Sequence, residues 1–218
     1  MKHKLINKKY KTPIGVVNCG LTSDKSSIEL IENKTYENGQ SEMYKTDSFQ
    51  IELIEFKIRT PLYNGDTLTD SQGWIWRITK QRADLGSIQL NCNLIDFDSN
   101  TDFDTATGEH LDAIEASNSD WILHIGTEDG EIMNWRAKEN DWFPDRLQDK
   151  VNFYQSITEM EKNGFKTKIP DLKLNERLHI QYICAYDKKP EDVNKVNTWL
   201  AVDEFKRKLE NWIGIWSE

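Results

Sequence analysis

Five side chains that carry oxygen ligands follow one another near the middle of the chain. They are Asp98, Asn100, Asp102, Asp104 and Glu109. They take positions 1, 3, 5, 7 and 12 of a twelve-residue window, which is the ligand spacing of an EF-hand calcium loop. Position 6 is Phe103, where the sharp turn of such a loop needs glycine, and a predicted strand stands in place of the incoming helix. We therefore expect a solvated acidic linker over residues 98–108, with a calcium site as the alternative.

Histidine offers a second kind of chemistry. His124 and His179 both fall within predicted strands, and if they lay side by side in one sheet, a nearby carboxylate would complete a metal or acid–base site. The simpler interpretation is an ordinary hydrogen bond for each ring on a polar sheet face. The sequence offers no helical pair of metal-binding histidines and no nucleophile with a neighbouring base. The glycines of the second half are too scattered for a phosphate-binding loop.

The distribution of charge is the most unusual feature of the chain. No Lys or Arg occurs between Arg82 and Arg136, whereas twelve Asp and Glu do. Residues 1–98 hold 13 basic and 13 acidic side chains, and residues 99–218 hold 15 and 24, so the second half carries the whole net charge of -9. A field of one sign indicates a partner of opposite sign, a cation or a solvated face.

Partner contacts are predicted from this acidic segment and from the tryptophans near the C-terminus. Trp199, Trp212 and Trp216 either pack on the sheet or form a partner surface, since aromatic side chains are favoured anchors at interfaces. The residues that we expect to contact a partner are Asp112, Glu115, Asp120, Glu128, Asp129, Trp199 and Trp216. Trp74 and Trp76 could stack bases on an exposed sheet. The neutral first half and acidic second half disfavour nucleic acid, so we expect these two in the core.

The first 97 residues read as strands. Ile88, Leu90, Cys92 and Leu94 alternate with polar residues, the period of a strand with one wet face. Trp74, Trp76 and Ile78 similarly share one face of a strand over residues 73–79. In residues 49–58 the apolar positions change phase after Leu53, which suggests a β-bulge or a bend. Further strands are expected over residues 16–21 and 27–32. This part is predicted to be an antiparallel barrel or sandwich.

Residues 109–218 mix helical and strand patterns. Short strands are expected over residues 121–127, 131–137 and 177–187, and a short helix over residues 109–116. Leu147, Val151, Tyr154, Ile157 and Met160 recur at three- and four-residue steps between Pro144 and Gly164, which predicts an amphipathic helix. A second is expected over residues 203–211. The fold class is therefore α+β, with a β domain over residues 1–97, an acidic linker over 98–108 and a smaller α+β domain over 109–218.

The remaining composition places the chain among ordinary folded proteins. Cys19, Cys92 and Cys184 are far apart and odd in number, which indicates reduced structural thiols rather than a disulfide scaffold. The N-terminus lacks an apolar run of signal-peptide length, and no stretch approaches the roughly 20 apolar residues of a membrane span. We expect a soluble cytoplasmic protein with no membrane contact and no cofactor other than the calcium alternative.

The last hundred residues resemble a known group of proteins. The segment Leu178–Tyr186, a polar loop, Thr198–Asp203 and a terminal helix are similar in style to small immunity proteins of bacterial polymorphic-toxin and type VI secretion systems. The resemblance covers residues 118–218. It implies a cytoplasmic acidic protein that binds and blocks a toxin, and a single-sign acidic face would speed association with a basic partner.

Three functions follow from these observations. The first is a non-catalytic acidic binding protein, of the immunity type, that blocks a cognate basic toxin. The second is a structural or accessory component of a phage or secretion assembly, which a strand-rich first half without catalytic motifs would suit. The third is an enzyme with an unrecognised site.

Overall fold

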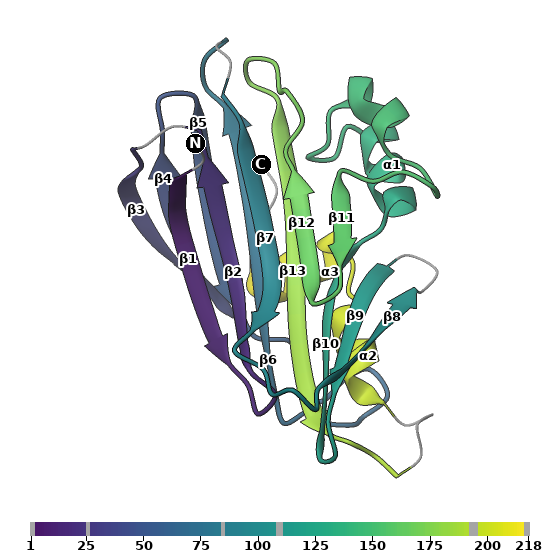
Figure 1. Ribbon diagram of the computed structural model, residues 1–218. Helices are drawn as coiled ribbons and strands as arrows, with labels where there is room; N and C mark the ends of the chain where they lie inside the picture. Colours follow the sequence, from purple (N-terminus) through teal and green to yellow (C-terminus); the bar gives the residue numbers. More distant parts are fainter. Residues whose placement is uncertain (1–2, 25–26, 84–85, 108–110, 192–195, 216–218) are drawn as a thin grey trace.

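Figure 1 shows the computed structural model of the chain, which describes residues 3–24, 27–83, 86–107, 111–191 and 196–215. Within these ranges, antiparallel strands form two sheets. The smaller sheet, in front in Figure 1, has the order β1 (His3–Lys11), β2 (Val16–Ser23), β7 (Ile88–Ile95), β12 (Gly164–Lys168) and β11 (Thr158–Glu161). The larger sheet has the order β3 (Glu29–Tyr36), β4 (Gly39–Lys45), β5 (Phe49–Phe56), β6 (Asp70–Lys80), β13 (Arg177–Lys188), β10 (Trp121–Glu128), β9 (Leu111–Ser117) and β8 (Asp102–Thr107).

The main hydrophobic core lies between the two sheets. Cys19 and Leu90 of the smaller sheet pack with Leu53, Trp76 and Ile180 of the larger one, and all five are fully buried. The alternating apolar residues of each strand point into this layer, as the period of two requires. The sandwich is therefore the correct alternative, and the predicted α+β class with its antiparallel, strand-rich first half is confirmed.

A second core covers the outer face of the larger sheet. The described residues form four helices: α1 (Gly130–Lys138), the 3₁₀ helix η1 (Asp145–Lys150), α2 (Asn197–Val202) and α3 (Lys206–Ile213). The last two cover this second core. Figure 1 shows α2 and α3 on the far side of the larger sheet. Phe56, Ile75 and Ile183 of the sheet pack there against Val202 and Leu209. Among the described residues, no helix combines the length and apolar character that crossing a bilayer requires.

These two cores explain the phase change within residues 49–58. Ile51 and Leu53 face the core between the sheets, whereas Ile54, Phe56 and Ile58 face the core beneath α3. The register of β5 is regular with β4 from Gln50 to Phe56 and with β6 from Phe49 to Phe56. The expected β-bulge is therefore wrong, and the apolar pattern instead reflects a strand that is covered on both faces.

The two halves of the chain share both sheets. β12 pairs with β7 in the smaller sheet, and β13 pairs with β6 in the larger sheet over ten residue pairs from Arg177 to Tyr186. Residues 102–107 of the predicted linker form β8, the last strand of the larger sheet in the described residues. The pairing therefore does not follow the expected division into residues 1–97 and 109–218, because strands of the second range complete both sheets of the first.

Three local predictions in the second half are wrong. Leu111–Ser117 is strand β9 rather than a helix, because both of its faces are buried. Gly130–Lys138 is helix α1 rather than a strand, and Asp129 caps it by accepting a hydrogen bond from Ile132 N at 2.9 Å. The long helix expected between Pro144 and Gly164 is absent, since only the short η1 forms there before β11. The second amphipathic helix is confirmed as α3.

A side chain of α1 ends η1. Asn134 Nδ2 donates hydrogen bonds to Gln148 O at 3.2 Å and Val151 O at 2.7 Å. These two carbonyls therefore accept from a side chain at the point where a continuing helix would supply its own backbone N–H groups. Leu147 and Val151 are buried as the helical spacing implied, but Tyr154 is 89% exposed. The apolar spacing therefore does not continue along one face.

Candidate functional site

The candidate site lies on the outer face of the larger sheet, where α3 covers the central strands. Leu209 and Ile213 are buried against this sheet, and the helix ends at Gly214, whose φ of 86° suits a residue without a side chain. α2 reaches the sheet beside it because Gly126 leaves room, since a Cβ there would lie 2.8 Å from Val202 Cβ. The two helices thus lie close to the strands and fix the walls of the site.

Buried charges hold α3 in place. Arg77 on β6 donates a hydrogen bond to Glu210 on α3, and its Nη1 lies 3.7 Å from Glu52 Oε2 on β5. Lys206 Nζ lies 2.7 Å from Asp141 Oδ1 and 3.0 Å from Glu210 Oε2. Arg77, Lys206 and Glu210 are almost completely buried. Because buried charges are tolerated only when they are paired, a shift of α3 on the sheet that separated these groups would be unfavourable.

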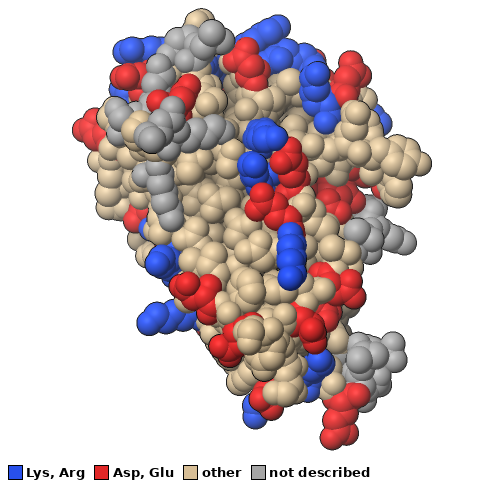
Figure 2. Space-filling view, viewed as in Figure 1, with Lys and Arg blue, Asp and Glu red and all other residues tan. Residues whose placement is uncertain are grey.

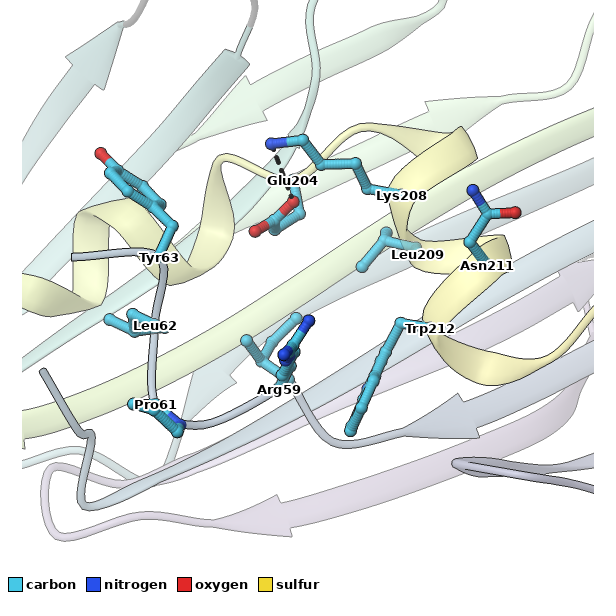
Figure 3. Close-up of a pocket in the computed structure, with 10 residues that line it drawn as sticks. Arg59, Pro61, Leu62, Tyr63, Glu204, Lys208, Leu209, Asn211 and Trp212 are labelled. Carbon is cyan, nitrogen blue, oxygen red and sulfur yellow. Dashed lines mark ion pairs between the residues drawn. The ribbon is translucent and has the colours of Figure 1, made fainter. Parts of the chain in front are cut away.

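A pocket of about 660 Å³ opens between α3 and the segment that follows β5. Its floor is apolar and consists of Ile58, Leu62 and Leu209, all of which are buried. Figure 3 shows Trp212 and Tyr63 at opposite ends of the pocket. The volume falls within the range of roughly 300–1,000 Å³ that is usual for ligand sites.

The upper part of this α3 pocket carries charge. The Arg59 guanidinium lies over the Trp212 ring at 5.9 Å from Cζ to the ring centroid, a cation–π contact. Glu204 Oε2 lies 3.6 Å from Lys208 Nζ, and Figure 3 shows this pair along the α3 side. Burial raises the pKa of Glu204, and Lys208 opposes that shift. In the described part of the chain, Arg59 forms no ion pair.

Hydrogen bonds fix the segment that forms the second wall. Trp212 Nε1 donates to Lys57 O at 2.9 Å, which sets the plane of the indole. Leu62 N donates to Asp66 O at 2.8 Å and closes the following turn. Asn64 Nδ2 donates to Asn197 Oδ1 at 3.3 Å and connects the turn to α2. The pocket is therefore preformed, and little order remains to be imposed when something binds in it.

The predicted acidic contacts do not form one face. Glu128 is 4% exposed and forms an ion pair with Arg136, so it belongs to the interior. Asp129 is the cap of α1. The pKa of Asp112 is raised by burial and by the neighbouring Asp129 charge, which places these two carboxylates together. Glu128 therefore does not belong to the exposed acidic residues. Its partner in the interior is Arg136, the first basic residue after the acidic stretch.

Glu115 lies on the helix-covered face of the sheet. Its Oε2 is 3.3 Å from His124 Nε2, directly across β9 and β10, and His124 lowers the pKa of Glu115. His124 Nδ1 is 2.9 Å from Thr198 Oγ1 at the start of α2. This carboxylate–imidazole–hydroxyl row resembles a catalytic triad in order, but Thr198 is fully buried and presents no nucleophile to solvent. The row instead attaches α2 to the sheet.

The remaining predicted contacts are dispersed. Asp120 is exposed in the turn between β9 and β10, Trp199 is half-buried against His124, and Trp216 lies outside the described residues. Asp104 stands opposite Glu115 in register. On the face that Figure 2 shows, that of the smaller sheet, acidic and basic side chains are interspersed. The charged side chains of β8 and β9, at the end of the larger sheet, are all acidic: Asp102, Asp104, Asp112 and Glu115.

The predicted calcium ligands do not lie on a curved loop. Asp98 and Asn100 are exposed in a turn, whereas Asp102 and Asp104 lie on the extended strand β8, and Glu109 is outside the described residues. An EF-hand wraps its ligands around the ion, which an extended strand cannot do over positions 5–10. Within the described ranges, no three His, Cys, Asp or Glu side chains gather as a metal site would require.

The two strand histidines are not neighbours. His124 stands opposite Ala185 on β13, six residues from His179, a separation of about 20 Å along the strand. His179 Nε2 is 3.2 Å from Gln181 Oε1, and its ring is fully buried. The expectation of an ordinary hydrogen bond describes both rings better than a shared metal or acid–base site.

Sequence reasoning missed the α3 pocket. Its residues come from two segments, 58–63 and 204–212, that are separated by about two thirds of the chain. The available signals were the apolar spacing of α3 and a segment with Arg59, Pro61 and Tyr63 after a strand. Neither indicates that the two segments meet.

Comparisons of the chain with models of protein families, with curated proteins and with solved structures found no match. The function is therefore argued from the α3 pocket and its surroundings.

Proposed function

We propose that this protein is a non-catalytic acidic binding protein of the immunity type, which blocks a basic toxin in the cytoplasm by direct association. The α3 pocket is the anchoring site for that partner. The resemblance of residues 118–218 to immunity proteins is consistent with this role, since α3 belongs to that range.

One observation carries the proposal. Arg59, Tyr63 and Trp212 line the same pocket, and Arg, Tyr and Trp are the side chains in which binding energy at protein interfaces is concentrated. Tyr63 is 77% exposed, so its ring at the end of the pocket is accessible to a partner. The rigid wall around it reduces the entropy lost on binding.

Acidic residues on the same side of the larger sheet favour a basic partner. Asp102, Asp104 and Glu115 lie on adjoining strands β8 and β9, with Asp104 and Glu115 directly opposite each other. Such a group raises the rate of encounter with a positively charged surface, although it adds little to the final affinity. The same charges disfavour nucleic acid as the partner.

The second candidate, a component of a phage or secretion assembly, is favoured by strand β3. Seven of its eight residues are exposed, including Leu30 and Ile31, so the strand is open on both faces as well as along its edge. A strand of this kind can accept a strand from a neighbouring subunit. Glu29, Glu32 and Lys34 oppose such pairing, because charged side chains protect an edge.

Site-specific photo-crosslinking tests the proposal. A benzoylphenylalanine replaces Tyr63 in the native host, and the matched control carries it at Tyr154, which is 89% exposed but far from the pocket in sequence. We expect one basic protein to be captured from position 63 and not from position 154. The purified pair should form a one-to-one complex, and co-expression should suppress the toxicity of the captured protein.

Identical capture from both positions, or capture of nothing from position 63, would contradict the proposal. Benzoylphenylalanine at the exposed Ile31 of β3 tests the assembly role, and capture there of further copies of this chain or of a shell or tube protein would favour it.

A further inference from the structure

The chemistry of the α3 pocket indicates what part of a partner it accepts. We infer that the pocket binds a short peptide segment in which an acidic side chain stands next to a large apolar one. The inference rests on the proposed function and deepens it, because it names the segment of the partner that occupies the site.

The charge of the rim selects an anion. Arg59 has no ionic partner in the described part of the chain, and its contact with the Trp212 face leaves the guanidinium edge free. A guanidinium edge matches a carboxylate with two parallel hydrogen bonds. Lys208 adds a second cation, whose only described ionic contact is Glu204 at 3.6 Å, beyond hydrogen-bond distance. Two cations and one carboxylate therefore leave the rim positive.

The floor selects an apolar side chain. Ile58, Leu62 and Leu209 are buried and form a continuous apolar surface between Tyr63 and Trp212. A Phe or Leu side chain placed there would remove its own surface and part of theirs from water, at roughly 25 cal/mol per Å². An ion alone would leave the accessible part of this floor in contact with water.

Glu204 selects an N–H donor. Its Oε2 is shielded from solvent and faces Lys208 Nζ at 3.6 Å, but the side chain as a whole is 21% exposed and lines the pocket. A peptide N–H between the acidic and apolar side chains would donate a hydrogen bond to the accessible part of this carboxylate. The cationic rim, the apolar floor and Glu204 therefore match an acidic side chain, an apolar side chain and an amide N–H. A peptide carries these three groups at adjacent positions.

A set of small probes tests the inference by NMR titration of the indole N–H of Trp212, identified by its loss in Trp212→Phe. The probes are acetyl-Glu-Phe-amide, acetyl-Gln-Phe-amide, acetyl-Lys-Phe-amide and 3-phenylpropionate, which lacks the peptide N–H. We expect millimolar binding of the Glu probe. The Gln probe, and the Glu probe on Arg59→Ala, should each bind about tenfold more weakly. Arg82→Ala, a change at an exposed arginine elsewhere, should have no effect.

Equal binding of the Lys probe, unchanged affinity in Arg59→Ala, or no shift up to about 10 mM of the Glu probe would overturn the inference. If 3-phenylpropionate binds as tightly as the Glu probe, the occupant is a small organic acid and the peptide assignment is wrong. The photo-crosslinking result at position 63 does not depend on the peptide titration. A captured partner without Glu-probe binding refutes only the segment, whereas probe binding without a captured partner refutes the proposed function.

Discussion

Arg77 and Glu210 stand 133 residues apart in the chain and form an ion pair in the interior, which joins the central strand β6 to helix α3. The pair lies under the helix that supplies one wall of the α3 pocket. The position of Leu209 and Trp212 therefore depends on a contact that is inaccessible to solvent.

Glu210→Gln should destabilise the fold by about 3 kcal/mol, because it leaves Arg77 and Lys206 buried with less compensating charge. Glu52, at 3.7 Å from Arg77, keeps the loss near the low end of the range for broken buried pairs. Urea unfolding measures the change. Glu131→Gln, at an exposed position on α1, is the matched control and should stay within about 0.5 kcal/mol of the wild type. Equal stability of the two variants would show that the pair contributes nothing.

His179 should make stability depend on pH. Burial lowers its pKa well below the usual value, and the positive charges of Arg136, Lys206 and Arg77 lower it further. The folded state therefore stays unprotonated while the unfolded chain takes up a proton below about pH 6.5, so stability falls as pH falls, by up to about 1.4 kcal/mol per pH unit. His179→Gln should flatten this part of the curve relative to His3→Gln, which changes an exposed residue. Parallel curves for both variants would contradict the assignment.

The cysteines should be unreactive in the folded protein. Cys19 and Cys92 stand directly opposite each other on β2 and β7, and both are fully buried, as is Cys184. Burial raises the pKa of Cys92, with the neighbouring Cys19 adding to the shift, so little thiolate is present. Ellman's reagent should react with all three thiols in denaturant and with none under native conditions. Rapid reaction of one thiol in the native state would show that this region opens readily.

Calcium should bind no more tightly than about millimolar, the weak end of known calcium modules. The extended backbone of Asp102–Thr107 is the physical reason, because it separates ligands that an EF-hand would gather. Calorimetric titration measures the affinity. Micromolar binding with a one-to-one endpoint, abolished in Asp98→Ala/Glu109→Ala, would make the linker a metal site.

The strands with one wet face could be predicted well from sequence. Ile88–Ile95 alternates apolar and polar residues, and the structure buries the apolar set as the period requires. The prediction failed where a segment is covered on both faces, as at Phe49–Phe56, because alternation then disappears. It failed again after Pro144. The apolar residues there are spaced as in one helix, but they belong to several short elements that pack separately.

The site was less predictable than the fold. Composition suggested an acidic face, but a count of charges does not say which carboxylates are buried. Glu128 is in the interior with Arg136, and Asp129 caps a helix. The pocket depends on tertiary contacts between two distant segments, about which local periodicity carries no information.

The position of β13 also has a consequence for synthesis of the chain on the ribosome. β13 fills the place between β6 and β10, yet it is translated roughly a hundred residues after β6. At about 5–20 residues per second, β6 would wait about 5–20 s for its neighbour, with one edge unpaired. During that interval the nascent chain resembles an aggregation-prone intermediate, because the edge of β6 over Asp70–Thr79 stays open until its partners Arg177–Tyr186 have emerged.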